Sequence, residues 1–201
     1  GGYVAAIRAA QLGLETAVVE RAPALGGTCL NWGCIPTKAL LEHAHALKIA
    51  RDWKEWGLTL GEAAIGIDMN QVQARKDKIV KGLTGGVEFL FKKNKIVCFK
   101  GSGRLAGTGK VQITEGDKQT ISVKKEIVVA TGSQPRSVPG ITIDKKRIIT
   151  SDEAIGLTTI PKSIVVMGSG AVGVEFASIF RRFGSEVTIV ELLPRLVPIE
   201  D

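Results

Sequence analysis

Two stretches of the chain repeat the same order of apolar and polar positions. In each, ten residues with helical spacing lie between two glycines, and a short apolar run, TAVV or VTIV, then ends in a glutamate. A single offset of 171 residues aligns these landmarks, which are Gly2, Gly13 and Glu20 in the first copy and Gly173, Gly184 and Glu191 in the second. A helix stopped by a glycine and followed by a strand that ends in an acidic residue is the αβ half of a βαβ unit, as found in dinucleotide-binding folds.

The second copy is the more complete of the two. Residues 164–167 (IVVM) predict a buried parallel strand directly before the glycine-rich stretch 168–173. The first copy lacks this strand and, since Gly2 matches the third glycine of the stretch, it also lacks the first two. At its other end the sequence stops soon after the second strand of the second copy, where a dinucleotide-binding domain normally continues with further βαβ units. We therefore expect a fragment at both ends, with both domains incomplete.

The residues between the two copies predict further elements. Apolar spacing predicts a helix over 37–50 and a lysine-rich helix over 70–93 that is interrupted or bent near Gly85 and Gly86. Short apolar runs predict a strand over 96–100, a hairpin made of strands 111–114 and 120–123, and a buried strand over 127–130.

An irregular connector follows the last of these strands. Pro135, Pro139 and Gly140 interrupt any regular pattern, and we place a domain boundary within residues 136–150. The predicted fold class is α/β, with two Rossmann-like dinucleotide-binding domains over residues 1–143 and 144–201. The first domain carries a β-hairpin or meander insertion.

Composition narrows the class of protein. The 201 residues are 44% hydrophobic and 23% charged, which fits a soluble globular protein with a sizeable core. No apolar run approaches the roughly 20 residues of a membrane helix, and no signal peptide opens the chain. Three cysteines do not make a secreted disulfide scaffold, so a reducing compartment is the default expectation.

The net charge of +7 could indicate an acidic partner or nucleic acid. The basic residues gather over 75–81, 92–95 and 145–147, without the interleaved aromatic residues on which bases would stack. We interpret the charge as a solvated face and expect neither a nucleic-acid nor a membrane partner.

The glycines of the second copy have the spacing of a phosphate-binding loop. Gly168, Gly170 and Gly173 follow a predicted strand and open a predicted helix, whose first N–H groups would point at phosphates. Glu191 comes eighteen residues after Gly173 and would accept hydrogen bonds from ribose hydroxyls. This favours NAD over NADP, because a carboxylate repels a 2′-phosphate; Arg195 is the only nearby cation. Two such units imply two dinucleotides, and a nicotinamide with a flavin is the natural pair.

Two of the three cysteines, Cys29 and Cys34, have only four residues between them, which allows three interpretations. A zinc site would need about two further ligands, and Cys98 lies far along the chain while His43 and His45 occupy two sides of a predicted helix. We expect these histidines to be surface or packing residues and Cys98 to be a small core residue. A structural disulfide closing so short a loop would add little stability in a reducing compartment.

The third interpretation is a redox pair. Cys34 immediately precedes Ile35 and Pro36, and proline suits the first turn of the helix that follows. The helix N-terminus and nearby Lys38 would favour a thiolate at Cys34. A stabilised thiolate is a good leaving group in thiol–disulfide exchange.

Together these motifs resemble the flavoprotein disulfide reductases, the family of pyridine nucleotide–disulfide oxidoreductases. The resemblance rests on GGTCLNWGCIPTK at 26–38, ATGS at 130–133 and GSGAVGVE at 168–175, and it spans all 201 residues. CIPTKALL is similar to the dihydrolipoamide dehydrogenase branch, whereas glutathione and mercuric reductases more often carry valine before the proline. The resemblance implies that electrons pass from dihydrolipoyl groups through a Cys29–Cys34 redox disulfide and FAD to NAD⁺, with FAD in the first domain and NAD in the second.

The resemblance also implies roles for individual residues. Cys29 would be the interchange thiol, Cys34 the thiolate against the flavin, and Lys38 would reach the flavin ring near N5. The residues implied to contact FAD are Gly2, Glu20, Arg21, Gly26, Gly27, Thr28, Cys29, Lys38, Gly103, Thr131, Gly132 and Ser133. Those implied to contact NAD are Gly168, Gly170, Val172, Gly173, Glu175 and Glu191, with Glu175 near the nicotinamide ribose.

Other features of the family have no counterpart in this sequence. The family's acid–base histidine lies in a C-terminal dimerisation domain, and neither His43 nor His45 matches it. The resemblance implies a homodimer in the bacterial cytoplasm or mitochondrial matrix, and a partner that is the lipoyl-bearing acyltransferase of 2-oxo acid dehydrogenase complexes or the glycine cleavage lipoyl protein. The alternatives are a related disulfide or mercuric reductase that uses NADPH, or a non-catalytic nucleotide-binding fragment; we expect the isolated chain to be inactive.

Overall fold

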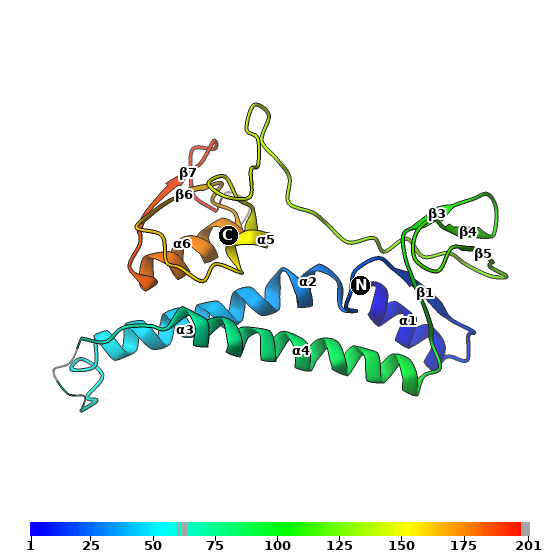
Figure 1. Cartoon of the computed structure of the whole chain (residues 1–201), viewed down its shortest axis with the longest axis horizontal. Helices are drawn as coiled ribbons and strands as arrows, with labels where there is room; N and C mark the ends of the chain where they lie inside the picture. Colours follow the sequence, from blue (N-terminus) through cyan, green and yellow to red (C-terminus); the bar gives the residue numbers. More distant parts are fainter. Residues whose placement is uncertain (60, 62–63, 198–201) are drawn as a thin grey trace. The chain divides into compact units, whose positions relative to one another are not determined.

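The computed structural model describes residues 1–59, 61 and 64–197, which form helices, two parallel strand pairs and one antiparallel sheet (Figure 1). The contacts divide the chain into two compact units. Unit 1 consists of Gly1–Asn31 and Val80–Gln134, and unit 2 consists of Trp32–Ile79 and Pro135–Asp201. These units are defined by contacts, whereas the predicted domains over residues 1–143 and 144–201 are defined by the nucleotide that each would bind. The division at residue 143 therefore stays a prediction.

Unit 1 contains the first αβ copy and the predicted hairpin. Its elements are α1 (Gly2–Gln11), β1 (Ala17–Glu20), α2 (Gly27–Asn31), β2 (Val97–Lys100), β3 (Gly103–Leu105), β4 (Lys110–Ile113) and β5 (Gln119–Ser122). Strands β1 and β2 pair in parallel with Glu20 opposite Lys100, and β3, β4 and β5 form an antiparallel sheet in that order. The helix and strand of the first copy, the strand near 96–100 and the hairpin are therefore confirmed. Strand β3, over whose residues no strand was predicted, extends the hairpin to the meander form of the predicted insertion.

Unit 2 contains the second αβ copy. Its elements are α3 (Cys34–Arg51), α5 (Ser151–Ala154), β6 (Ser163–Met167), α6 (Ala171–Phe183) and β7 (Glu186–Val190). Strands β6 and β7 pair in parallel, as the repeat predicts. Helix α4 (Met69–Lys93) begins in unit 2 and ends in unit 1.

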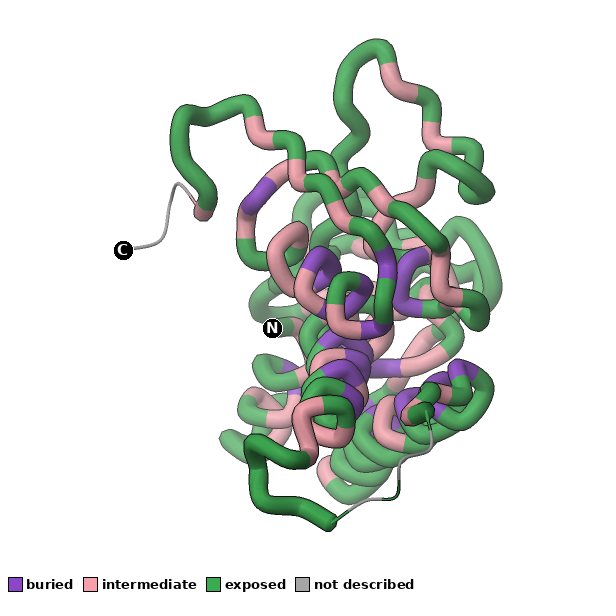
Figure 2. Tube along the Cα trace, turned by 90° about the vertical axis from the view of Figure 1, so that its left-hand side faces the viewer, coloured by how far each residue is buried: buried purple, intermediate pink, exposed green. Residues whose placement is uncertain are grey.

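The core of unit 2 forms where α3 packs against α6. Leu40, Ala44 and Leu47 lie three and four residues apart and so share one face of α3. They join a cluster with Ile179 and Phe180 of α6, both of which are at most 2% exposed. Buried positions recur along the helices in this way (Figure 2). Because each large apolar side chain buried contributes about 1.5–3 kcal/mol, this contact fixes α3 and α6 within unit 2.

The predicted interruption of the lysine-rich helix is wrong. Helix α4 runs as a single α-helix of 25 residues through Gly85 and Gly86. Each glycine costs about 1 kcal/mol relative to alanine in a helix. Thr84, Val87 and Phe91, spaced three and four residues apart on either side of the glycines, are all buried. Tertiary packing of this face therefore outweighs the low helix propensity of the two glycines.

The prediction of a buried strand over residues 127–130 is also wrong. This stretch has no strand assignment, and Val128 and Val129 are 70% and 68% exposed. A strand needs a neighbour for its backbone N–H and C=O groups, and none of the described strands pairs with this stretch.

Strand β6 is parallel as predicted but is not buried on both faces. Val165 and Met167 are 62% and 53% exposed, while Ile164 packs against the core of unit 2. Burial alternates along β6 because successive side chains point to opposite faces, and within this unit α6 covers one of them. Among the described residues, no helix combines the length and the apolar character needed to cross a membrane.

Candidate functional site

Cys34 is the first residue of α3 and is exposed. Its position follows from the local sequence, because Gly33 ends the preceding turn and its carbonyl accepts a hydrogen bond from the Thr37 N–H at 3.1 Å. Pro36 is buried in the first turn, where its missing N–H removes no helical hydrogen bond. The helix starts three residues earlier than predicted, so that Cys34 lies inside its first turn. Cys29 is exposed on α2 of unit 1.

Lys38 lies one turn after Cys34 and is paired with a carboxylate of α6. Its Nζ donates to Oε1 of Glu175, and the two residues are 137 positions apart in the sequence. The side chains are 59% and 26% exposed, so the pair lies at the edge of the contact between α3 and α6. The structure therefore joins a predicted flavin-side residue to a predicted NAD-side residue, and both belong to unit 2.

The glycine-rich loop between β6 and α6 has a backbone that requires glycine. Gly168 has φ +97°, in the left-handed region that residues with a Cβ rarely adopt. A Cβ at Gly173 would lie 2.1 Å from the carbonyl oxygen of Gly168, so helix and loop approach more closely than any side chain allows. At Gly170, the N-cap of α6, a Cβ would meet no atom within 4 Å. The open side of the loop and the N–H groups at the start of α6 fit a diphosphate group.

Glu191 follows β7 and turns back onto this loop. Its Oε2 accepts hydrogen bonds from the N–H and the hydroxyl of Ser169, both at 2.7 Å, and its Oε1 accepts one from the N–H of Leu193 at 3.0 Å. These donors, the Leu193 N–H first and then the two groups of Ser169, lower the pKa of Glu191 to about 2. Glu191 is therefore an ionised, well-oriented carboxylate at the end of β7, as a ribose-binding residue must be.

In unit 1, Glu20 occupies the equivalent position at the end of β1. Its Oε1 accepts a hydrogen bond from the N–H of Ala22 at 2.8 Å, which orients the carboxylate above the loop that follows. The Nζ of Lys100, the residue opposite Glu20 in β2, donates to the carbonyl of Pro23 at 3.1 Å and so holds the same loop. The carboxylate and the loop thus share one edge of the parallel pair.

Unit 1 also brings the two predicted flavin-binding segments together. The hydroxyl of Thr28 donates to the carbonyl of Ser133 at 3.2 Å, across 105 residues of sequence. Gly132 has φ +78°, and a Cβ there would lie 3.3 Å from the Thr28 hydroxyl. A Cβ at Gly2, the start of α1, would lie 3.1 Å from the Cβ of Ala130. The helix start, the loop and residues 131–133 therefore lie close together and fit a second dinucleotide.

The other predicted site residues have fewer contacts that bear on a site. Arg21 is exposed in the loop after β1, and Val172 is 57% exposed in the first turn of α6. Gly26 is buried beside Leu30, and Gly27 opens α2. Gly103 starts β3 with Val19 of β1 as its nearest neighbour.

The other candidates for a site are the two histidines and the residue types that bind metal ions. His43 donates a hydrogen bond from its Nδ1 to the carbonyl of Ala39 at 2.7 Å, while His45 is exposed. In the described part of the chain, no group of three or more His, Cys, Asp and Glu side chains is arranged to hold a metal ion.

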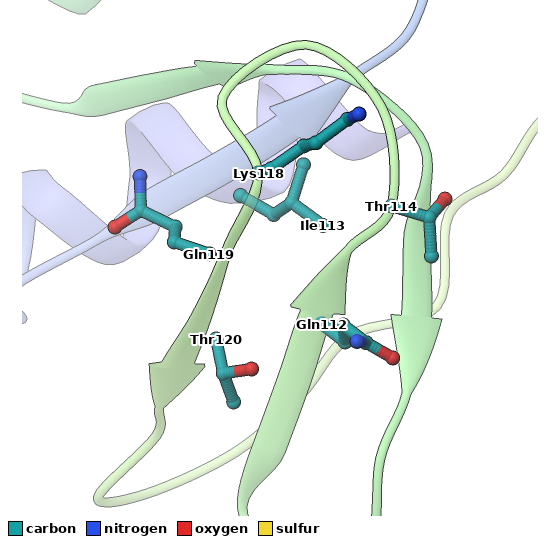
Figure 3. A pocket seen from close by; sticks show the side chains of 6 residues that line it. All are labelled: Gln112, Ile113, Thr114, Lys118, Gln119 and Thr120. Atoms are coloured by element: carbon teal, nitrogen blue, oxygen red, sulfur yellow. The ribbon is translucent and has the colours of Figure 1, made fainter.

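A shallow cavity of about 360 Å³ lies on β4, β5 and the turn that joins them (Figure 3). Its lining includes no residue predicted to act in a site; the residues are Gln112, Ile113, Thr114, Lys118, Gln119 and Thr120.

Sequence reasoning missed two residues that shape the candidate sites. Ser169 lies between two of the predicted glycines and is completely buried, and Lys100 holds the loop after Glu20. The signal for Ser169 was a hydroxyl in a loop followed by an acidic residue at the end of the next strand. No local signal pointed to Lys100, because its partner lies 77 residues away.

Comparison with known proteins finds relatives that match this chain along its whole length. All residues from 1 to 201 match the family model described as "Pyridine nucleotide-disulphide oxidoreductase". Dihydrolipoyl dehydrogenase 3 of Pseudomonas putida is 49% identical over 199 residues, which cover 98% of this chain and 42% of that protein. The mitochondrial dihydrolipoyl dehydrogenase 2 of Arabidopsis thaliana is 48% identical over 203 residues, covering 100% of this chain and 40% of that protein.

Two other similar proteins carry different names. Leghemoglobin reductase of Vigna unguiculata is 47% identical over 203 residues, covering 100% of this chain and 38% of that protein. Among solved structures, the HOCl-induced flavoprotein disulfide reductase RclA of Escherichia coli superposes with a TM-score of 0.82 at 28% identity, covering 100% of this chain and 42% of that one. The chain thus spans about 40% of the length of the curated relatives it matches.

Proposed function

Because the chain belongs to the pyridine nucleotide–disulphide oxidoreductase family, we propose that it is part of an FAD-dependent dihydrolipoyl dehydrogenase. Such an enzyme oxidises dihydrolipoyl groups and reduces NAD⁺. The observation that carries the proposal is the exposed Cys34 at the start of α3, with Lys38 one turn further on. Cys29, with four residues between it and Cys34, is the second member of the redox pair.

The two cysteines act by thiol–disulfide exchange. One thiolate of the dihydrolipoyl group attacks Sγ of Cys29 in the Cys29–Cys34 disulfide, a mixed disulfide forms, and Cys34 leaves as a thiolate. The second substrate thiolate then attacks the substrate sulfur of the mixed disulfide, the lipoyl ring closes, and Cys29 leaves as a thiolate. The substrate has lost two electrons and two protons, and the cysteine pair has gained the two electrons. The N–H groups of the first turn of α3 favour negative charge on the side chain at its start.

Each cofactor is assigned to residues that fit it. Glu20, the loop 21–28, Gly103 and residues 131–133 would hold FAD, and the loop from Gly168 to Gly173 with Glu175 and Glu191 would hold NAD⁺. A bound FAD would supply the two-electron redox chemistry that links the reduced cysteines to NAD⁺. Glu175 orients the ammonium group of Lys38 through their ion pair.

The proposal extends to partners and location. The dihydrolipoyl group would be carried by the acyltransferase subunit of a 2-oxo acid dehydrogenase complex or by the lipoyl protein of glycine cleavage. The complete enzyme would be a homodimer in the bacterial cytoplasm or the mitochondrial matrix. The isolated 201-residue chain would not turn over, since it spans only about 40% of its relatives.

A spectroscopic experiment on the complete gene product tests the redox pair. The purified protein should be yellow, and reduction by two electrons should produce a long-wavelength absorbance band from a thiolate beside oxidised flavin. Cys34→Ser should abolish this band, whereas Cys98→Ser, which changes a half-buried cysteine of β2, should leave it intact. A colourless protein, or a band that survives both Cys29→Ser and Cys34→Ser, would refute the proposal.

Turnover assays then define the substrate. Dihydrolipoamide with NAD⁺ is compared with glutathione disulfide and with Hg²⁺, each with NADPH. The proposal expects turnover with the first pair only. Faster turnover with either NADPH reaction would assign the chain to another branch of the family, and no turnover in any assay would indicate a non-catalytic nucleotide-binding protein.

A further inference from the structure

Ser169 is the residue between the first two glycines of the loop after β6, and its side chain is completely buried. A buried hydroxyl must find hydrogen-bond partners, since leaving it unpaired is costly. Ser169 Oγ donates to Oε2 of Glu191 at 2.7 Å and accepts a hydrogen bond from the N–H of Val197 at 3.2 Å. The Ser169 N–H donates to the same carboxylate oxygen at 2.7 Å. The hydroxyl and the backbone N–H of Ser169 are thus directed at Glu191 and at the segment that follows it.

These contacts occupy most of the positions at which the Glu191 carboxylate can accept hydrogen bonds. A carboxylate has about four lone-pair positions, and the two on Oε2 are filled by the N–H and the hydroxyl of Ser169. Among the hydrogen bonds of the described residues, Oε1 accepts one, from the Leu193 N–H, so that within this part of the chain one lone-pair position of Oε1 stays open to a further donor. The negative charge is held at the end of β7 by hydrogen bonds from Ser169 and from Leu193.

The same serine also closes the backbone segment after Glu191. Besides its bond to Ser169 Oγ, the Val197 N–H donates to the backbone carbonyl of Ser169 at 3.2 Å. The segment from Leu192 to Val197 is therefore connected to the loop after β6 directly through Val197 and, at its other end, through Glu191. Ser169 consequently controls both the orientation of the carboxylate and the segment that would face the adenosine end of a dinucleotide.

We propose that Ser169 is a positioning residue that holds the Glu191 carboxylate in place for the adenosine ribose of NAD and thereby sets the preference of this site for NAD over NADP. This inference rests on the proposed function of the loop and Glu191 as the NAD site. The open position on Oε1 accepts a ribose hydroxyl, and the fixed charge repels a phosphate on the same ribose. Without the hydroxyl, Glu191 keeps its N–H donors but can turn away, so that NAD loses an acceptor and NADP meets less repulsion.

Binding measurements on the complete gene product test this proposal. Isothermal titration calorimetry gives Kd for NAD⁺ and for NADP⁺ in the wild type, Ser169→Ala and Ser169→Gly. Loss of one hydrogen bond to a charged group should lower the NAD⁺/NADP⁺ preference about tenfold, mostly through weaker NAD⁺ binding. The glycine variant serves as the second substitution if the alanine variant does not fold.

Ser185 provides a matched control. It is also a completely buried serine of unit 2, and its hydroxyl donates to the carbonyl of Pro161 at 2.6 Å, without contact to Glu191. Ser185→Ala should lower thermal stability to an extent similar to Ser169→Ala but leave the NAD⁺/NADP⁺ preference unchanged. The pair of variants thereby separates the loss of a buried hydrogen bond from the loss of the positioning contact.

A second readout needs no nucleotide. Titration of the Glu191 carboxyl by ¹³C NMR should show a pKa of about 2 in the wild type and in Ser185→Ala, and a higher value in Ser169→Ala. The positioning role is refuted if both Ser169 variants keep the wild-type preference or if the Glu191 titration does not change. A wild-type protein that binds neither dinucleotide would instead refute the proposed NAD site, and this inference with it.

Discussion

The close approach of Gly173 to the loop after β6 leads to a quantitative prediction. A Cβ at this position would lie 2.1 Å from the carbonyl oxygen of Gly168 and 3.0 Å from its carbonyl carbon. Both atoms belong to the backbone and cannot rotate away as a side chain would. Gly173→Ala should therefore force α6 away from the end of β6.

The magnitude follows from the size of the overlap. The loop must move by about 1 Å before the new contact reaches 3.0 Å, the distance below which Cβ contacts are essentially never found. Overpacking of this kind costs about 1–3 kcal/mol, and we take the upper value because the obstacle is backbone. Replacing glycine by alanine within a helix stabilises the folded protein by about 1 kcal/mol, because alanine has the higher helix propensity. We expect a net loss of about 2 kcal/mol in the free energy of unfolding, or about 4–8 °C in Tm for a protein of this size.

Gly170→Ala is the matched control in the same loop. Its Cβ would meet no atom within 4 Å, so no overlap opposes it. Alanine is a poorer N-cap than glycine and should destabilise α6 by about 0.5 kcal/mol. Alanine also lowers the conformational entropy of the unfolded chain, which stabilises the folded protein by about the same amount. Gly170→Ala should therefore keep the wild-type Tm while its methyl group occupies the open side of the loop and weakens NAD⁺ binding.

Thermal unfolding followed by circular dichroism at 222 nm, together with NAD⁺ titration, distinguishes the two variants. Gly173→Ala should lose stability and nucleotide binding, and Gly170→Ala should lose binding only. If Gly173→Ala were as stable as Gly170→Ala, the packing argument for the third glycine would be refuted.

Three further predictions follow from the contacts of unit 2. The Lys38–Glu175 pair is partly exposed, so a double-mutant cycle with Lys38→Met and Glu175→Gln should give a coupling energy below about 1 kcal/mol by urea unfolding, and a larger value would contradict the exposed geometry. The pKa of Glu191 is lowered to about 2. Its stabilising contribution should be complete above the unfolded pKa of about 4.3 and should be lost as the pH falls toward 2. Urea unfolding of Glu191→Gln should therefore show a deficit at pH 6 that disappears near pH 2, and a deficit independent of pH would contradict the assignment. Phe180→Ala removes a side chain that is 2% exposed and stacked on Phe176 and should cost about 3–5 kcal/mol in chemical denaturation, whereas a loss below 1 kcal/mol would place Phe180 outside the core.

The sequence by itself determined the elements whose signals are local. The offset of 171 residues between the two copies predicted α1 with β1 and α6 with β7, because helical spacing, a stopping glycine and an apolar run all act within about 20 residues. The start of α3 at Cys34 was foreseen to within three residues from the spacing of the apolar residues on its buried face. The cysteine pair and the glycine loop, on which the proposed function rests, were also recognisable, since short, fixed spacing defines both.

The tertiary structure decided whatever depends on partners distant in the sequence. Residues 127–130 have the composition of a strand but form none, because a strand exists only where a neighbour completes its hydrogen bonds. Helix α4 continues through two glycines because packing of its buried face outweighs local propensity. Lys38 with Glu175 and Ser169 with Glu191 meet only after folding, since no periodicity specifies which side chains converge across 137 or 22 residues. Local patterns therefore specify elements, and long-range packing specifies the contacts that orient the groups of a site.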